Sequence, residues 1–413
     1  MPQRAVISGI GVIAPTGVGA ADHWFAGLAG RSGIRELPGR TAPGLKVRVA
    51  GQVAGFDETE FVANRLLVQT DRWSWLGLAA TELALSDAAL DTKKEFPFHL
   101  SVVTAAASGG NAFGQREIQA LYKEGPRSVS AYQSIGWFYA ASSGQISIRH
   151  QLKGACGVLV ADAAGGIDAL AQSRRLISRG SGVVVTGGTE APLSPYAMAC
   201  QASQETLSPD PDPATAYRPF APDATGQVPG EGGAMLVVEE WRRAHLRGAT
   251  VYAEVAGSAS THDATDATAP ASDHAQYARA MREAIGRSGC EPGDIDAVFA
   301  DGAGDPLGDE LEARALREVF GPRRVPVTVP KTMTGRLCSG GAALDLAWAA
   351  LSVSHGVLPP TINVDTRQAA ARHGIDLVAE PRELPGTATV LVAARGAGGF
   401  NSAAVLRTPA YDV

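Results

Sequence analysis

The sequence predicts a layered α/β protein in which helices cover buried β-sheets. Short runs rich in β-branched residues alternate with helical patterns along most of the 413 residues, and this alternation is typical of α/β folds. The 48 glycines suit a chain with many turns between strands and helices. A hydrophobic fraction of 45% supplies enough apolar side chains for a large core.

Nine runs are expected to form strands, because each is short, apolar and rich in β-branched residues. In chain order they read AVISGIGVI, LSVVTAAAS, GVLVADAA, GVVVTGGTE, GAMLVVEE, TVYAEVAGS, AVFADGAG, VPVTVPK and TVLVAARGAG. The polar, low-complexity stretch at 261–273 is expected to be a surface loop. Because TVYAEVAGS resembles the opening strand of a second unit, we expect two halves, residues 1–249 and 250–413.

Two turns of the sequence resemble each other. VLVADAAGGIDALA and AVFADGAGDPLGDELEA both run from a strand through Ala-Asp-small-Ala-Gly into a helix. The two turns lie about 140 residues apart, a distance far too long for a solenoid repeat. The similarity indicates either an internal duplication or a chance likeness between Ala- and Gly-rich turns.

The first 17 residues, MPQRAVISGIGVIAPTG, are basic and then apolar, as in a secretion signal. Gly9, Gly11 and Pro15 interrupt the apolar run, so we expect this segment to be the first strand. No apolar stretch reaches membrane-spanning length. A formal net charge of −6 argues against a nucleic-acid partner and against an anionic membrane surface.

Common cofactor and metal patterns are weak or missing in the sequence. GIGVIA fits the loose dinucleotide pattern G-x-G-x-x-A, but Pro15 follows where a helix should already run. The eight histidines form no metal-ligand spacing. The four cysteines, Cys156, Cys200, Cys290 and Cys338, show neither a metal nor a disulfide framework. We expect no cofactor, no metal and a reducing, cytoplasmic location.

Residues 157–180 have the outline of a nucleophile elbow without a nucleophile. A strand through Val158–Val160 leads into a tight turn, Asp162–Ala164, and Gly165 then opens a helix that stops before Gly180. Many α/β enzymes place a reactive Ser or Cys at such a turn, at the positive end of a helix dipole. Here alanine, Ala163, stands at the tip.

Several stretches together resemble the β-ketoacyl synthases of thiolase fold. They are RPFAPDATGQVPGEGGAMLVVEE, DGAGDPLGDELEARAL, VPVTVPKTMTGRLCSGGAALD, GVLPPTINV and GFNSAAVL, and the resemblance covers nearly the whole chain. It implies a five-layered αβαβα fold built from two similar halves.

The same resemblance implies that all three catalytic positions are degenerate. The family's T-x-C-x-S-G-x-D-A segment places Ala163 at the nucleophilic cysteine, and its H-G-T-G-T and K-S-M-x-G-H segments place Asp301 and Arg336 at the two histidines. Alanine cannot form a thioester, aspartate would repel an enolate, and arginine cannot act as a neutral base. Ala397 stands at the phenylalanine gate of the family's G-F-G-G segment. The resemblance also implies a structural ion pair between Glu312 and Lys331.

The branch of closest resemblance is the chain length factor, or ketosynthase β subunit, of type II polyketide synthases. VSAYQSIGWFYAASSGQISIRH, ADGAG and VTVPKTMTGRLCSGG carry this likeness. It implies pairing with an active ketosynthase α subunit, an acyl carrier protein that delivers malonyl units, and a poly-β-ketone channel at the heterodimer interface. The branch usually has glutamine in an E-Q-A-G-G turn, and this chain has Ala163 instead. A contribution of that glutamine to initiation is therefore not expected here.

The resemblance places the channel-lining residues on the helix that follows SVVTAAASGG. By position they are Asn111, Gly114 and Ile118, with Tyr196 from the next segment. Because none of the first three is bulky, we expect a long product, of about ten ketide units or more, since nothing large closes the channel early. The alternative is a helix-entry turn at Asn111 and Gly114 with Ile118 as ordinary core.

Two other functions stay open on the sequence alone. One is an active β-ketoacyl synthase or thiolase with an atypical nucleophile, either Cys156 or Cys338, which lies two residues past Arg336. The other is a homodimeric acyl-binding protein without a catalytic partner. A neighbouring ketosynthase with an intact Cys-His-His set would favour the chain length factor.

Overall fold

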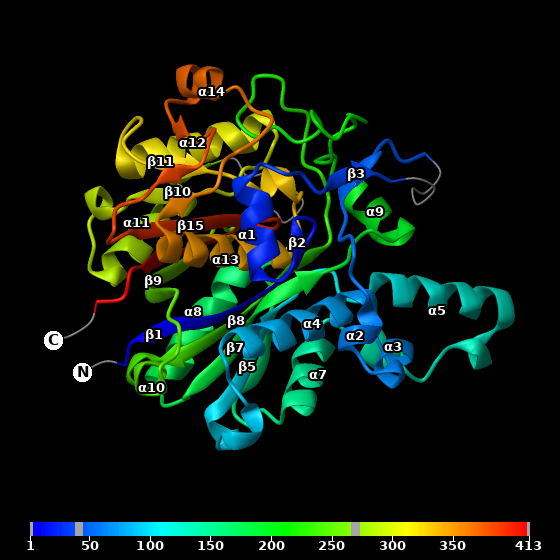
Figure 1. The fold of residues 1–413 in the computed structure, drawn as a ribbon. Helices are drawn as coiled ribbons and strands as arrows, with labels where there is room; N and C mark the ends of the chain where they lie inside the picture. The colour runs from blue at the N-terminus through cyan, green and yellow to red at the C-terminus, as the bar shows by residue number, and fades with distance from the viewer. Residues whose placement is uncertain (1–2, 38–43, 266–272, 411–413) are drawn as a thin grey trace.

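The strands of both halves form one hydrogen-bonded path. The computed structural model describes residues 3–37, 44–265 and 273–410. Within them the strand order is β13-β11-β10-β15-β16-β9-β1-β8-β7-β5-β6, and β2 (Gly17–Val18) pairs with β1 (Figure 1). The two halves meet through a short antiparallel contact between β1 and β9, at Val6 and Ile7.

The first half contributes five strands to this path, besides β2. Outward from the junction they are β1 (Ala5–Ala14), β8 (Gly232–Glu240), β7 (Val183–Glu190), β5 (Leu100–Ala105) and β6 (Cys156–Leu159). The first two steps along this order are antiparallel, and the next two are parallel. Because β6 pairs only with β5, it is the edge of the sheet.

The second half repeats this order of directions. Its strands are β9 (Ala253–His262), β16 (Phe400–Arg407), β15 (Thr389–Gly396), β10 (Ala297–Phe299), β11 (Pro326–Thr328) and β13 (Asp376–Leu377). Two antiparallel steps are again followed by parallel ones. The internal duplication is therefore visible in the topology. The two echoed turns, however, follow β6 and β10, which hold different places in the two halves, so their likeness is a chance one.

Helices complete a five-layered α/β fold, as the resemblance implied. The central helices α8 (Gly165–Ser178) and α13 (Ser339–His355) pack against each other and against strands of both halves. The outer layer on the first half includes α4 (Arg72–Asp87) and α7 (Ala141–His150). The outer layer on the second half includes α11 (Ala275–Ser288) and α12 (Pro306–Phe320). This arrangement buries both central helices between sheets.

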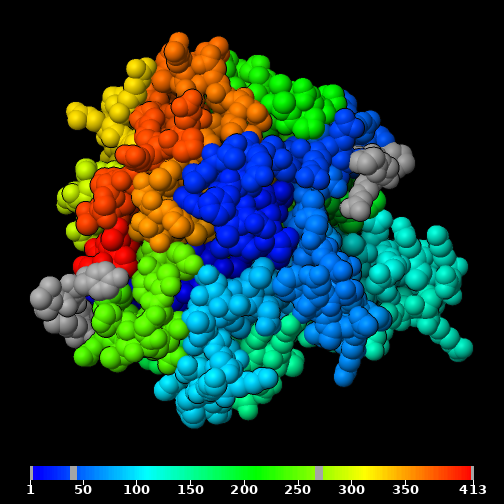
Figure 2. Space-filling model, viewed as in Figure 1, coloured from blue at the N-terminus to red at the C-terminus, as the bar shows by residue number. Residues whose placement is uncertain are grey.

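Other helices and two small sheets surround these layers. The remaining helices are α1 (Ala20–Leu28), α2 (Glu58–Phe61), α3 (Asn64–Gln69), α5 (Asn111–Glu124), α6 (Gln133–Gly136), α9 (Pro195–Ala202), α10 (Trp241–Leu246) and α14 (Thr366–His373). Two small hairpin sheets pair β3 (Ile34–Glu36) with β4 (Val49–Gly51) and β12 (Val357–Leu358) with β14 (Arg382–Glu383). Residues 111–139, which we call the arm, stand out from the layered body at the right of Figures 1 and 2.

All ten residues of β1 are buried, which confirms that the N-terminal apolar run is a strand. A Cβ at Gly11 would lie 1.9 Å from the carbonyl oxygen of Ala80 on α4, so this glycine lets the helix pack directly on the strand. The G-x-G-x-x-A likeness is thus explained by packing. Of the expected loop at 261–273, residues 266–272 lie outside the described residues. The boundary at 249/250 falls between α10 and β9 and stays a prediction.

Candidate functional site

The strand, turn and helix expected at residues 157–180 are present. β6 ends at Leu159, a single 3₁₀ turn covers Asp162–Ala164, and α8 begins at Gly165. Burial of Ile167, Leu170 and Ile177 fixes α8 between the sheets, so the turn is held on a rigid frame. Ala163 lies within this turn.

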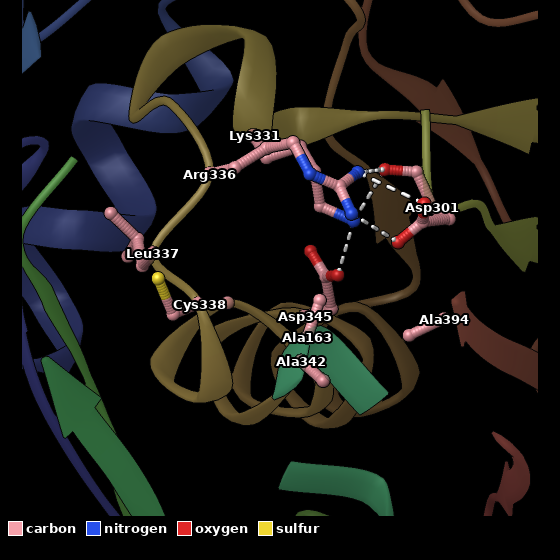
Figure 3. A pocket seen from close by; sticks show the side chains of 10 residues that line it. Ala163, Asp301, Lys331, Arg336, Leu337, Cys338, Ala342, Asp345 and Ala394 are labelled. Carbon is pink, nitrogen blue, oxygen red and sulfur yellow. Dashed lines mark hydrogen bonds and ion pairs between the residues drawn. The ribbon is translucent and has the colours of Figure 1, made fainter. Parts of the chain in front are cut away.

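The three degenerate positions meet at one small cavity (Figure 3). Ala163 comes from the turn after β6, Asp301 from the loop after β10, and Arg336 from the segment before α13. The cavity that they line with Leu337 and Cys338 has a volume of about 10 Å³. That volume is at the lower limit for one water molecule, so the cavity is too small for a growing polyketide chain.

Asp301 and Arg336 form a two-pronged ion pair across this cavity. Nη1 of Arg336 lies 2.9 Å from Oδ2 of Asp301, and Nη2 lies 3.1 Å from Oδ1. Nη1 also donates to the Asp301 carbonyl oxygen at 2.8 Å. Bidentate Arg–carboxylate pairs are strong and geometrically specific. The charges of Asp301 and Arg336 therefore neutralise each other.

The pair also fixes the protonation of its members. Burial alone would raise the pKa of Asp301, but the charges of Arg336 and Lys331 outweigh burial and hold that pKa below its ordinary value. Burial would lower the pKa of Arg336, and the Asp301 charge reverses the direction and raises it. Both groups stay charged at neutral pH, so Asp301 is a weak base and Arg336 a weak acid.

The expected ion pair between Glu312 and Lys331 is wrong. Nζ of Lys331 lies 2.6 Å from Oδ2 of Asp345 on α13, and it donates to the carbonyl oxygens of Ala300 and Asp301. The carboxylate of Glu312 instead accepts the backbone N–H groups of Asp301 and Gly302, at 2.8 and 2.7 Å.

The carboxylates of Glu312 and Asp345 stabilise different parts of the structure. Glu312 orients the loop that carries Asp301, and it also accepts a hydrogen bond from the Tyr277 hydroxyl at 2.9 Å. Asp345 compensates the buried Lys331. The sequence contains an indication of the pairing between Asp345 and Lys331, because Asp345 is the one acidic residue in the mostly apolar helix α13. A charge on a buried helix needs a partner of opposite charge.

The two candidate cysteine nucleophiles differ in position. Cys156 is exposed at the start of β6, and the elbow lies beyond the other end of that strand. A strand of this length spans about 13 Å, so Cys156 is remote from the cavity. Cys338 lines the cavity. Burial, together with the charges of Asp162 and Glu190, raises the pKa of its thiol well above the ordinary value, so the nucleophilic thiolate is disfavoured.

The four expected channel residues lie on the arm and on α9. Ile118 and Tyr196 are exposed, and Asn111 donates from its side-chain amide to the Ser108 hydroxyl. Gly114 is buried, and a Cβ there would lie 2.6 Å from Cδ1 of Trp137. The space that Gly114 leaves is therefore filled by an indole ring, which the sequence reasoning missed.

Within residues 3–37, 44–265 and 273–410, no group of three or more His, Cys, Asp or Glu side chains could hold a metal ion. Helices in this part of the chain are also too short or too polar to cross a membrane.

Known families match along most of the chain. Residues 3–244 match "Beta-ketoacyl synthase, N-terminal domain", and residues 252–365 match "Beta-ketoacyl synthase, C-terminal domain". The chain belongs to the β-ketoacyl synthase family. The thiolase-like fold inferred from the motifs is thereby confirmed.

Within the β-ketoacyl synthase family, the chain is similar to β subunits. It is 50% identical over 409 residues to the tetracenomycin polyketide synthase ketoacyl synthase beta subunit of Streptomyces glaucescens, covering 98% of each chain. The solved ishigamide ketosynthase/chain length factor matches with a TM-score of 0.91 and 25% identity, over 99% of this chain and 100% of that one. A type II acyl-carrier protein in complex with its ketosynthase bound to the hexaketide matches with a TM-score of 0.89 and 25% identity, over the same shares. The resemblance to type II ketosynthase β subunits is confirmed.

Proposed function

We propose that this chain is the chain length factor of a type II polyketide synthase and forms no carbon–carbon bond itself. The observation that carries this proposal is the Asp301–Arg336 ion pair beside Ala163, at the two positions that the family motifs assign to catalytic histidines. Condensation needs a thiolate and neutral imidazoles around a developing enolate. The cavity offers none of these groups, and it is too small for a growing polyketide chain.

The partner of this chain is a ketosynthase α subunit. Of the 16 exposed large hydrophobic side chains in the described part of the chain, 12 lie between Phe96 and Tyr196. This segment includes the arm and the edge strand β6. Exposed aromatic clusters mark protein interfaces, and the open edge of β6 can pair with a strand of another chain.

The poly-β-ketone channel lies against the arm. Ile118, Tyr196 and Trp137 are all exposed, α5 packs against α9, and the ring of Trp137 covers Gly114. Trp137 therefore supplies a large side chain where residue 114 has none. The channel is narrower than the residues of α5 alone indicate, so a product shorter than about ten ketide units becomes compatible with its lining.

An acyl carrier protein delivers the building blocks to the heterodimer. The solved relative that contains such a carrier has it in complex with its ketosynthase, and this chain takes the same kind of partner through the α subunit. In this assignment the thiolate comes from the α subunit, and this chain shapes the space into which the product grows.

Reconstitution tests this assignment. The chain is coexpressed with its ketosynthase α subunit and incubated with malonyl-loaded acyl carrier protein, and polyketide products are measured by liquid chromatography and mass spectrometry. Products are expected only when both subunits are present. Replacing Cys338 by serine should leave the yield unchanged. Products from this chain alone, or a loss of product in the Cys338→Ser variant, would favour the atypical nucleophile instead.

A further inference from the structure

Asp162, at the turn between β6 and α8, has an unusual backbone. Its φ is +46°, in the left-handed region that residues other than glycine, asparagine and aspartate rarely adopt. Such conformations persist where surrounding contacts hold them in place. The next residue along the chain is Ala163, so Asp162 lies directly beside the degenerate nucleophile position.

The carboxylate of Asp162 binds a backbone donor from the other half of the chain. The N–H group of Ala397, in the turn between β15 and β16, donates to its Oδ2 atom at 2.8 Å. The two backbones approach closely here, because a Cβ at Gly396 would lie 2.5 Å from the carbonyl oxygen of Ala161. The Ala397 N–H is thus fixed beside the elbow, and a negatively charged oxygen already accepts from it.

An elbow that accepts an acyl group needs such a donor free. In acyl transfer from a carrier thioester, a sulfur–carbon bond forms to the elbow thiolate while the carbonyl electron pair moves onto oxygen. The pair then returns, the bond to the carrier sulfur breaks, and the carrier thiolate takes up a proton. Backbone N–H groups at the turn and on a neighbouring loop stabilise the intermediate oxyanion. A donor that already binds a carboxylate cannot do so, and the carboxylate repels a second anion.

We propose that Asp162 is an internal anion that blocks the elbow as an acyl acceptor, in addition to the missing thiol at position 163. The inference rests on the proposed function, because it explains how the non-catalytic elbow is kept inert. The Ala397 N–H donates to Asp162, so it is not available to a substrate oxyanion. Restoring a cysteine at position 163 would then leave the elbow unreactive.

The charge of Asp162 already acts on its surroundings. It is among the causes that raise the pKa of the Cys338 thiol and that of the Glu190 carboxyl, in both cases after burial. The ionisable groups around the elbow are Asp162, Glu190, Asp301, Lys331, Arg336 and Asp345. Since Arg336 is committed to Asp301 and Lys331 to Asp345, Asp162 has no cation of its own within hydrogen-bond distance in the described part of the chain.

The test uses Ala163→Cys in the heterodimer, with Asp162 retained, changed to Asn or changed to Gly. Asparagine keeps an oxygen that can accept from Ala397 but removes the charge, whereas glycine removes both and suits the positive φ. Peptide-resolved mass spectrometry gives the iodoacetamide alkylation rate at position 163 between pH 6 and 10, and the extent of acylation by acetyl-loaded acyl carrier protein. Asp168→Asn is the matched control, because Asp168 binds Ser260 and Ser402 and not Ala397.

We expect alkylation at pH 7 to rise at least tenfold in both Asp162 variants, and acylation to rise at least tenfold in Asp162→Gly. The Asp168→Asn control should stay within threefold of the Ala163→Cys parent. Equal alkylation in parent and Asp162→Asn would overturn the proposal, and so would unchanged acylation in a folded Asp162→Gly heterodimer. If the glycine variant does not assemble, the asparagine variant alone decides the question. Product formation by the unmodified chain, measured in parallel, separates failure of this inference from failure of the proposed function.

Discussion

The cavity at Ala163 and the surface of the arm differ in what they offer to a substrate. The cavity has a volume of about 10 Å³, and the paired charges of Asp301 and Arg336 line it. The arm exposes aromatic side chains, among them Tyr132, Trp137 and Phe138. Two charges that neutralise each other leave little to attract a substrate. Exposed aromatic rings, in contrast, favour binding to another protein. In the proposed function, this chain therefore acts through its surface, and the cavity is part of its core.

The largest effect should follow from breaking the ion pair in the cavity. Asp301→Asn or Arg336→Met leaves one charge buried without its partner, which costs about 3–5 kcal/mol in the free energy of unfolding. The double variant removes both charges and should regain most of this loss. Urea unfolding of the heterodimer measures all three. The exposed pair Arg279–Glu283 is the control, since Arg279→Met should cost less than about 0.5 kcal/mol. Additive single effects would mean that the two charges do not stabilise each other.

Glu190, near the same cavity, should give a pH-dependent effect. Burial raises the pKa of its carboxyl to about 7, against contacts from Ser339 and two backbone N–H groups that lower it. Because the folded value lies above the unfolded one, the stabilising contribution is complete below pH 4.5 and is lost as the pH rises through 7. Relative to Glu190→Gln, the native heterodimer should lose about 3 kcal/mol of unfolding free energy over this range. Parallel pH profiles of the two proteins would contradict a raised pKa.

On the arm, a charge should weaken the heterodimer. Phe138 is exposed in the isolated chain, and burying an aromatic ring at an interface contributes about 2–3 kcal/mol. Phe138→Asp loses this contribution and adds an unpaired charge, so the dissociation constant should rise at least about 100-fold. Copurification and calorimetric titration measure the change. Leu246→Asp is the control, since Leu246 is 85% exposed on α10, away from the arm. Equal losses in both variants would remove the arm from the interface.

The smallest effect concerns product length. Gly114→Thr would place a Cβ 2.6 Å from Cδ1 of Trp137, so the indole must move toward the exposed surface. If this surface lines the channel, the product should shorten by about one or two ketide units, because overpacking reduces the space available. Ala112→Thr adds the same side chain at an exposed position of α5 and should leave the length unchanged. Identical products from an intact Gly114→Thr heterodimer would mean that Trp137 does not bound the channel.

The elbow and its degenerate positions could be predicted because they are local. The strand, turn and helix of residues 157–180 follow one another directly in the sequence, and the structure has β6, the turn and α8 there. Asp301 and Arg336 were named one by one from short motifs, and the structure brings both to the cavity at Ala163. Their mutual pairing was not foreseen, although opposite charges at two positions of one site are a signal for it.

The sequence could not predict contacts between segments that are far apart along the chain. Lys331 was assigned to Glu312, but Glu312 is occupied by the backbone of the loop that it orients, and Asp345 reaches Lys331 from α13. Trp137 fills the space at Gly114 because the segment after α6 folds back on α5. Both cases depend on which elements pack together, and no spacing along the chain encodes that.

Mass spectrometry of the intact heterodimer during turnover tests the central claim most directly. The two subunits are incubated with malonyl-loaded acyl carrier protein, quenched in acid and separated, and the covalent mass of each chain is measured. We expect acyl and polyketide adducts on the α subunit alone, with this chain at its unmodified mass. An acyl adduct on this chain, at Cys338 or elsewhere, would contradict the account.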